Sequence, residues 1–435
     1  METKEKNSAT RRVKKEVSKT PKVEEVKEKA INEEKVTLKN ILILVAIIIA
    51  IIVVLVFFKG TVAWNIVVLL LMLTALIFVH EGGHFLMAKK CGVFVSEFAL
   101  GMGPKVCGFK RKGDPTQYSL RALPIGGYCQ MAGEEMEDDD TLPKNQFMCN
   151  KTKLQRSLIL VAGVTMNFIT AIILLFFISL VWGHTEQRSY VGHVEENTPA
   201  YEAGIVEGDR VLEFNGHKVS TWDDLTVASA MKNTNNKYVY TIKKSDGKVV
   251  EYELEPIDSV TIDGQSILVN ENNTLESIAK KYNKDVDDLI VSKVIGISSP
   301  TERIRGVIPS IEYAFTKFGS IVKTMISIIV NLITGNIGLN ALSGPVGMYT
   351  VVNTAAKYGI ANILFLMAYL SINLGVLNIL PFPAFDGGRL LFVIIEAITR
   401  KKVDARIEGY FHSIGFILIM MLMLYITFQD IINLL

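Results

Sequence analysis

The sequence has few cysteines, almost no net charge and few charged residues of any kind. Its 4 cysteines in 435 residues are too sparse for a disulfide framework, and none of them forms a Cys-x-x-Cys pair. The 46 basic and 44 acidic side chains leave a net charge of +2, so the bulk charge gives no indication of a nucleic-acid partner. Only 21% of the residues are charged, 49% are hydrophobic and the mean hydropathy is +0.32. This composition argues against a single soluble domain and favours an integral membrane protein.

Five apolar segments are long enough to cross a bilayer. A hydrocarbon core about 30 Å thick needs roughly 20 mostly apolar helical residues. The segments that qualify are 41–58, 62–79, 158–182, 360–380 and 414–428 with its flanks. A further stretch, Phe315 to Ile333, contains Lys317 and Lys323 but keeps apolar residues at helical spacing. That pattern predicts an amphipathic helix at the membrane interface.

Lysine and arginine next to these segments predict the orientation of the chain. The first 39 residues are rich in lysine and glutamate, which is typical of a disordered cytoplasmic tail. Basic residues also cluster between the second and third predicted spans and between the fourth and fifth, which places both loops in the cytoplasm. Residues 184–310 are then extracytoplasmic. The prediction is a multi-pass plasma-membrane protein whose N-terminus and four cysteines lie in the reducing cytoplasm.

The sequence His80-Glu81-Gly82-Gly83-His84 follows the second predicted span. Two histidines four residues apart lie on one face of a helix, so both imidazoles can bind one Zn²⁺ ion. A glutamate beside the first histidine can take a proton from the metal-bound water. The alternative is two solvated histidines at a helix end, but ionisable groups at membrane depth are costly and usually functional. The motif therefore predicts a zinc site in which Glu81 is the catalytic base.

Asp386 is the candidate for the third protein ligand that a catalytic zinc requires. It lies in the segment Asn378-Ile379-Leu380-Pro381-Phe382-Pro383-Ala384-Phe385-Asp386-Gly387-Gly388, where prolines and glycines interrupt a helix. Interrupted backbone at membrane depth is tolerated only inside protein or beside a water-filled cavity. From the residues alone, Asp386 could equally cap a helix that begins near Gly388.

The HEGGH motif and the distant NxxPxPxxDG segment together resemble the site-2 protease family of intramembrane zinc metalloproteases. The branch of the bacterial sigma-E regulator protease fits best, and segments 101–104, 123–128 and 147–156 resemble it too. The resemblance covers about residues 62 to 430 and implies hydrolysis of a peptide bond in or near a substrate's transmembrane helix. It also implies a zinc cofactor and a substrate-binding role for Asn378, Pro381 and Pro383.

Asn167 departs from the family pattern, which usually has Gly-Pro before Met-Asn-Phe. Here Gly163-Val164-Thr165 precedes Met166-Asn167-Phe168. A substrate-binding role for Asn167 and an ordinary helix-packing role both remain open.

The resemblance also indicates partners. It implies transmembrane protein substrates, such as anti-sigma factors or remnant signal peptides, and an upstream site-1-type protease that trims them. Residues 92–131 read as short strands with a turn at Gly113-Asp114-Pro115. Such a sheet beside the zinc could pair with an extended substrate, or it could be a covering hairpin without substrate contact.

Two further resemblances concern the external segment. The pattern of glycines between short strands at residues 190–256 resembles that of a PDZ domain. Such a domain would act either as a filter that admits only substrates already trimmed, or as a passive cap that excludes large ones. Residues 268–289 resemble part of a LysM module, a family that binds peptidoglycan. A peptidoglycan contact and a merely structural insertion both remain open.

The expected fold class is an α-helical polytopic membrane protein with about five transmembrane helices, a small membrane-associated β region and an external PDZ-like α+β domain.

A catalytically inactive scaffold that binds peptides is the alternative function. A transporter is a third, which the absence of an inverted repeat disfavours. The expected order is a basic tail (1–39), an extra transmembrane helix (40–60), the first part of the catalytic core (61–183), the PDZ-like domain (184–258), the LysM-like insertion and linker (259–310), and the amphipathic helix with the rest of the core (311–435).

Overall fold

The computed structural model describes most of the chain beyond the N-terminal tail. The described residues are 38–59, 61–134, 142–231, 237–262, 265–269, 273–282, 286, 289, 291–338, 342 and 344–432. The tail predicted at residues 1–39 lies almost entirely outside this part of the chain.

Within the described residues, five helices are long and apolar enough to cross a membrane. They are α4 (Val62–Lys90), α5 (Lys153–Trp182), α9 (Val307–Ile333), α11 (Ile360–Ile379) and most of α13 (Ala405–Ile432). The other main helices are α3 (Leu38–Phe57), α10 (Pro345–Lys357) and α12 (Asp386–Thr399). The chain is therefore a helix-rich membrane protein. Four of the predicted spans fall in these helices; the fifth, 41–58, lies in α3, where the described residues give only a shorter apolar helix, Ile48–Phe57, and α9 is counted among the five instead.

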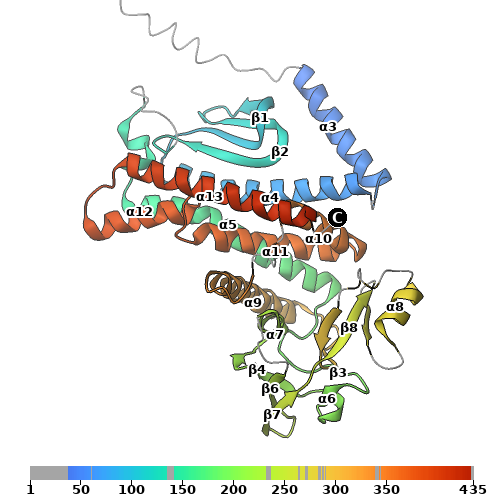
Figure 1. The fold of residues 1–435 in the computed structure, drawn as a ribbon. Coiled ribbons are helices and arrows are strands. Elements are labelled where there is room, and N and C mark those ends of the chain that lie inside the picture. The colour runs from blue at the N-terminus through green and yellow to red at the C-terminus, as the bar shows by residue number, and fades with distance from the viewer. Residues whose placement is uncertain are drawn as a thin grey trace, which may run out of the picture.

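Two predicted segments are parts of longer helices. Helix α4 contains the predicted apolar run 62–79 and, as the HEGGH motif predicts, continues through both histidines; it ends at Lys90, because residues 80, 83, 84 and 88 form a buried face that keeps the helix packed beyond its apolar run. The predicted interfacial helix at 315–333 is part of the longer α9, which by length and composition alone could cross a bilayer. Figure 1 shows α9 at a steep angle to α4 and α13.

A long hairpin lies along one side of the helices, opposite the other sheets (Figure 1). Its strands are β1 (Val95–Lys110) and β2 (Gln117–Met131). Both bend where glycines adopt positive φ, at Gly101 and Gly103 in β1 and Gly126 in β2, so that Ala99 pairs with both Tyr128 and Ser119. The predicted short strands are thus the straight pieces of two bent ones.

A charged cluster holds the bent hairpin together. Arg121 donates to both carboxylate oxygens of Glu97 at 2.8 and 3.0 Å, and the Tyr128 hydroxyl donates at 2.6 Å. Burial alone raises the pKa of Glu97, but the hydroxyl groups of Ser119 and Tyr128 and the Arg121 guanidinium lower it below its ordinary value. Glu97 therefore stays ionised and links the two halves of β2.

The segment after α5 forms two small α+β units. The first contains β3 (His193–Val194), α6 (Pro199–Glu202), β4 (Arg210–Phe214), β5 (His217–Lys218), α7 (Trp222–Ala230), β6 (Tyr238–Lys243) and β7 (Val249–Leu254), with sheet order β5-β4-β6-β7. The second contains β8 (Ile257–Ile262), β9 (Gln265–Leu268), α8 (Leu275–Tyr282) and β10 (Val291–Val294), with sheet order β10-β8-β9. Strand β11 (Ile297–Ser298) then returns to pair with β3, and Ile295 joins the core of the first unit.

Candidate metal centre

The site is built where helices α4 and α5 cross at glycines. A Cβ added to Gly83 would lie 2.3 Å from the carbonyl oxygen of Ala162, and one added to Gly163 would lie 2.4 Å from His84 Nε2. Small residues let helix backbones approach closely in membranes. The crossing therefore brings α5 directly against the two imidazoles of α4.

Three side-chain atoms from two distant parts of the chain converge at this crossing. Asp386 Oδ2 lies 3.0 Å from His80 Nε2 and 3.2 Å from His84 Nε2, and the two Nε2 atoms are 3.1 Å apart. The side chains of His80 and His84 are only 8% and 7% exposed, and that of Asp386 is 21% exposed. Among the described residues, this is the one group of three or more such side chains arranged to hold a metal ion.

The convergence fits a metal ion better than a set of hydrogen bonds. Asp386 Oδ2 is buried and makes no hydrogen bond among the described residues, although both Nε2 atoms are close to it. Tetrahedral zinc with ligands at about 2.0–2.1 Å separates its donor atoms by about 3.3 Å. Two imidazoles and one carboxylate also match the donor set of a catalytic zinc that keeps one position open.

Both histidines are oriented through their other ring nitrogen. His84 Nδ1 lies 2.8 Å from the carbonyl oxygen of Ile159, so it carries the proton and leaves Nε2 free for a metal. His80 Nδ1 lies 3.2 Å from the amide of Asn167, which is fully buried. A half-turn of this amide would let the unpaired Asn167 Oδ1 accept the Nδ1 proton of His80. Ser371 Oγ donates to the Asn167 carbonyl oxygen at 2.9 Å and ties α11 to the same point.

Asp386 is the first residue of α12, and its carboxylate is directed at the histidines. The N-cap of α12 is Phe385, and no side chain caps the helix there. The helix-capping alternative for Asp386 therefore has no support in the geometry. Asn378 is half-buried at the end of α11, Pro381 is exposed and Pro383 is half-buried. These three residues precede Asp386 in the chain but do not belong to the group of metal-binding atoms.

Glu81 stands beside this group on α4. Its carboxylate is close enough to His80, His84 and Asp386 to interact electrostatically with each of them, and it is hydrogen-bonded to the backbone of Cys129 in β2. The hairpin thus contacts the residue that the sequence predicts as the base.

A cavity of about 380 Å³ lies between α5, α12 and α13; it is lined by Arg389 of α12 but by none of the three metal-binding side chains. Arg156 and Glu396 form an ion pair at 2.6 Å on its wall, and Arg389 pairs with Glu134. Arg389 lies one helical turn after Asp386. A cavity with charged walls provides room for water next to the helix that carries Asp386. A single sequence does not indicate these pairs, because their partners are far apart in the chain.

Comparisons with known proteins cover more than four fifths of the chain. The model of peptidase family M50 matches residues 68–422. A candidate zinc metalloprotease of Clostridium perfringens is 35% identical over 368 residues, covering 84% of this chain and 98% of that relative. The regulator of sigma-W protease RasP of Bacillus subtilis is 29% identical over 444 residues, covering 84% and 98%. The zinc metalloprotease RasP of Shouchella clausii is 30% identical over 435 residues, covering 82% and 96%. The similarity is therefore not confined to the HEGGH segment.

Proposed function

The chain belongs to peptidase family M50, the site-2 protease family of zinc metalloendopeptidases, and from this premise we propose that His80, His84 and Asp386 hold its zinc ion. The observation that carries this proposal is the approach of Asp386 Oδ2 to within 3.2 Å of both Nε2 atoms. A bound zinc ion polarises the scissile carbonyl and lowers the pKa of water. The inactive scaffold and the transporter have no comparable observation in their favour.

Glu81 acts as the general base in the proposed reaction. It takes a proton from the attacking water and delivers it to the nitrogen of the departing peptide. The contacts of His84 with Ile159 and of His80 with Asn167 hold both imidazoles in fixed orientations. The substrate helix must unwind at the cleaved bond, because its carbonyl groups are otherwise hydrogen-bonded within the helix. Asn378, Pro381 and Pro383 are proposed to contact the unwound segment, whereas Asn167 is proposed to act on His80 instead.

Replacement of Asp386 by asparagine is expected to lower zinc affinity by at least about 10- to 100-fold and to stop cleavage, because a neutral amide is a weaker ligand than a carboxylate. Zinc content of the purified chain measures the effect, with His84→Ala as a second variant expected to lose zinc. Asp404→Asn is the matched control, because Asp404 accepts a backbone hydrogen bond at the start of α13 and asparagine caps equally well. Full zinc occupancy and full activity in Asp386→Asn would refute the ligand assignment.

The proposed substrates are transmembrane proteins cleaved in or near their spans. The name of the Bacillus subtilis relative, a regulator of sigma-W protease, supports membrane-bound anti-sigma factors as one class. Remnant signal peptides are a second proposed class of substrate, since they too are membrane-embedded segments. An upstream site-1-type protease would first remove the external part of such a substrate.

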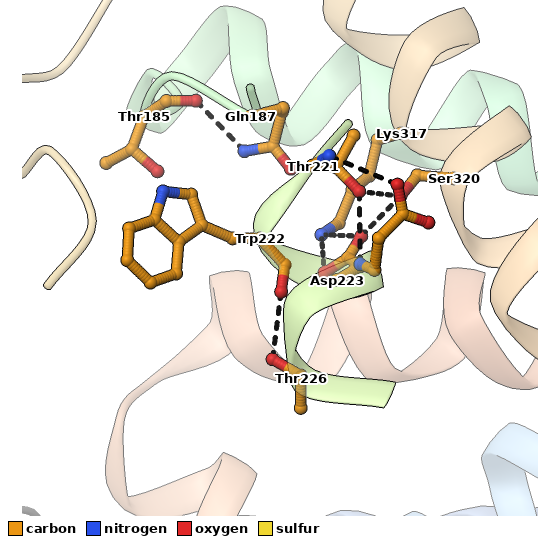
Figure 2. Close-up of polar contacts among 9 residues, drawn as sticks. Thr185, Gln187, Thr221, Trp222, Asp223, Thr226, Lys317 and Ser320 are labelled. Atoms are coloured by element: carbon orange, nitrogen blue, oxygen red, sulfur yellow. Dashed lines mark hydrogen bonds and ion pairs between the residues drawn. The ribbon is translucent and has the colours of Figure 1, made fainter. Parts of the chain in front are cut away.

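The first α+β unit, which we propose to be a PDZ-like filter, is fixed to α9 by polar contacts. Figure 2 shows Asp223 of α7 directed at Lys317 and Ser320 of α9. Lys317 donates to both Asp223 oxygens at 2.8 Å, and Ser320 donates at 2.8 Å. Lys317 is 11% exposed and Asp223 is 29% exposed, so solvent screens this pair less than it screens a fully exposed one. The unit is thereby held against a helix that packs on α5 and α11.

Replacement of Asp223 by alanine is expected to speed cleavage of an untrimmed substrate by about 10-fold, because the filter is then held less firmly over the core. Hydrogen bonds to charged groups contribute about 1.5–3 kcal/mol each, which corresponds to at least about 10-fold in an equilibrium. The measurement is cleavage of one transmembrane substrate with and without a folded external domain. Asp246→Ala, which removes an exposed ion pair with Lys248 in the same unit, should change neither rate. Equal rates for Asp223→Ala and wild type on the untrimmed substrate would contradict the filter.

The second α+β unit has a small core of its own, formed by Val260, Ile262, Ile278, Ala279 and Leu289. Because β11 returns to β3 after it, we propose that this unit is inserted within the PDZ-like domain. A peptidoglycan contact and a structural insertion both remain compatible with it, and cosedimentation of the purified chain with isolated cell wall distinguishes the two.

The proposed topology has a cytoplasmic N-terminus, cytoplasmic segments between α4 and α5 and between α11 and α13, and both α+β units outside. An impermeant thiol reagent is expected to label Cys149, the exposed cysteine, only after intact cells are permeabilised. Asp246→Cys, in the first α+β unit, should be labelled without permeabilisation. Labelling of the unchanged chain in sealed cells would reverse the assignment.

A further inference from the structure

The loop between α11 and α12 holds a backbone conformation that its own residues do not favour. Ala384, two residues before Asp386, has φ of +70°, in the left-handed region. Residues with a Cβ rarely adopt this region and keep it only where surrounding structure enforces it. The conformation of Ala384 sets the direction in which the chain enters α12, and Asp386 is the first residue of that helix.

Helix α13 supplies the contact that holds this conformation. The backbone N–H of Ala384 donates to His412 Nδ1 at 2.9 Å. His412 therefore has its lone pair on Nδ1 and its proton on Nε2. The loop's backbone hydrogen bonds, such as Phe382 N–H to the Leu380 carbonyl oxygen at 2.7 Å, join residues of the loop to one another or to the adjoining turns of α11 and α12. The His412 bond instead ties the loop to another helix.

A second contact on the same face of α13 fixes the loop from the side. A Cβ added to Gly415 would lie 1.9 Å from Pro383 Cβ. Because Gly415 follows His412 by three residues, both lie on one face of the helix. The ring of His412 also approaches α12, where a Cβ added to Gly388 would lie 3.2 Å from Cε1. One face of α13 thus meets the loop and the first turn of α12 at successive points.

We propose that His412 is a positioning residue for the metal centre: by accepting the Ala384 N–H it fixes the loop that presents Asp386 to zinc. This inference rests on the proposed function, in which Asp386 is a ligand. His412 itself does not touch the metal-binding atoms and acts through the backbone of residues 384–386. Its effect should therefore appear in zinc affinity before it appears in the folding of the chain.

The test compares two substitutions at one position in the purified full-length chain. Asparagine at position 412 keeps an acceptor, Oδ1, near the position of the His412 Nδ1 atom, whereas leucine fills a similar volume without an acceptor. Zinc affinity is measured by competition with a chromophoric chelator. H412L is expected to bind zinc about 10- to 100-fold more weakly than wild type, the range found for residues that orient metal ligands. H412N is expected to remain within about 3-fold of wild type, and excess zinc should restore cleavage by H412L.

A glycine pair keeps the proposal testable if H412L does not fold. Gly415→Ala forces a methyl group into Pro383, whereas Gly409→Ala on the same helix adds one where nothing lies within 4 Å. Gly415→Ala is expected to weaken zinc binding and Gly409→Ala to leave it unchanged. Wild-type affinity in both H412L and Gly415→Ala, or equal losses in H412L and H412N, would overturn the proposal. Asp386→Ala, measured alongside, distinguishes failure of the ligand assignment from failure of the positioning role. If Asp386→Ala retains zinc, Asp386 is not a ligand. If Asp386→Ala loses zinc while H412L and Gly415→Ala keep it, His412 does not position the loop.

Discussion

Replacement of Glu81 by glutamine is expected to slow peptide cleavage by at least about 10²- to 10⁴-fold, the usual contribution of a general base. Glutamine keeps the size of the side chain and its hydrogen-bonding reach to the Cys129 backbone, but it cannot take a proton from water. His80, His84 and Asp386 remain in place, so zinc content should stay near that of the wild type. Single-turnover cleavage of a transmembrane substrate and metal analysis of the same preparation measure both quantities.

Two controls make this result specific to the base. Glu207→Gln changes an exposed glutamate of the first α+β unit and should leave cleavage intact. His84→Ala should remove zinc and activity together, whereas Glu81→Gln removes activity alone. Turnover at the wild-type rate by Glu81→Gln would exclude the general-base role, and loss of zinc in that variant would show that Glu81 supports the metal instead.

The sequence alone indicates which residues form the candidate site, and the structure brings His80, His84 and Asp386 together. The spacing of His80 and His84 follows from the helical repeat alone, and the prolines and glycines before Asp386 indicate interrupted backbone at membrane depth. What one sequence left open was whether Asp386 binds metal or caps a helix. That choice depends on the direction of its carboxylate, which is set by packing between α4, α5 and α12.

The supporting contacts could not be predicted, for a physical reason. His84 is oriented by the backbone carbonyl oxygen of Ile159. Every residue has a backbone carbonyl, so the amino-acid type at position 159 does not indicate this contact. The pair of Arg156 and Glu396 spans 240 positions, and nothing in one sequence indicates which charges meet. The apolar run of α4 ends at the first ionisable residue, so hydropathy alone does not indicate that the helix continues to Lys90, where its buried face is still packed. The positive φ of Ala384 could not be predicted either, because alanine rarely adopts the left-handed region.

The two central glycines of the HEGGH motif are not equivalent in the structure, although they are identical in sequence. A Cβ added to Gly83 would meet the Ala162 backbone at 2.3 Å, whereas one added to Gly82 has nothing within 4 Å. Backbone atoms of a packed helix cannot turn aside as a flexible side chain can. Alanine at position 83 must therefore push α4 and α5 apart at the point where the two imidazoles meet α5.

Gly83→Ala is accordingly expected to lower zinc affinity and cleavage by about 100-fold or more, and to destabilise the chain by about 1–3 kcal/mol through overpacking. Gly82→Ala is the matched control, because the same methyl group enters open space. Alanine favours a helix over glycine by about 0.8–1.0 kcal/mol, so this variant should retain zinc and unfold at the same or a higher temperature. Metal analysis and thermal unfolding of both variants in detergent measure the contrast. Equal zinc content in Gly83→Ala and Gly82→Ala would show that close approach of α5 is not needed to form the metal centre, because the two changes differ only in where the methyl group points.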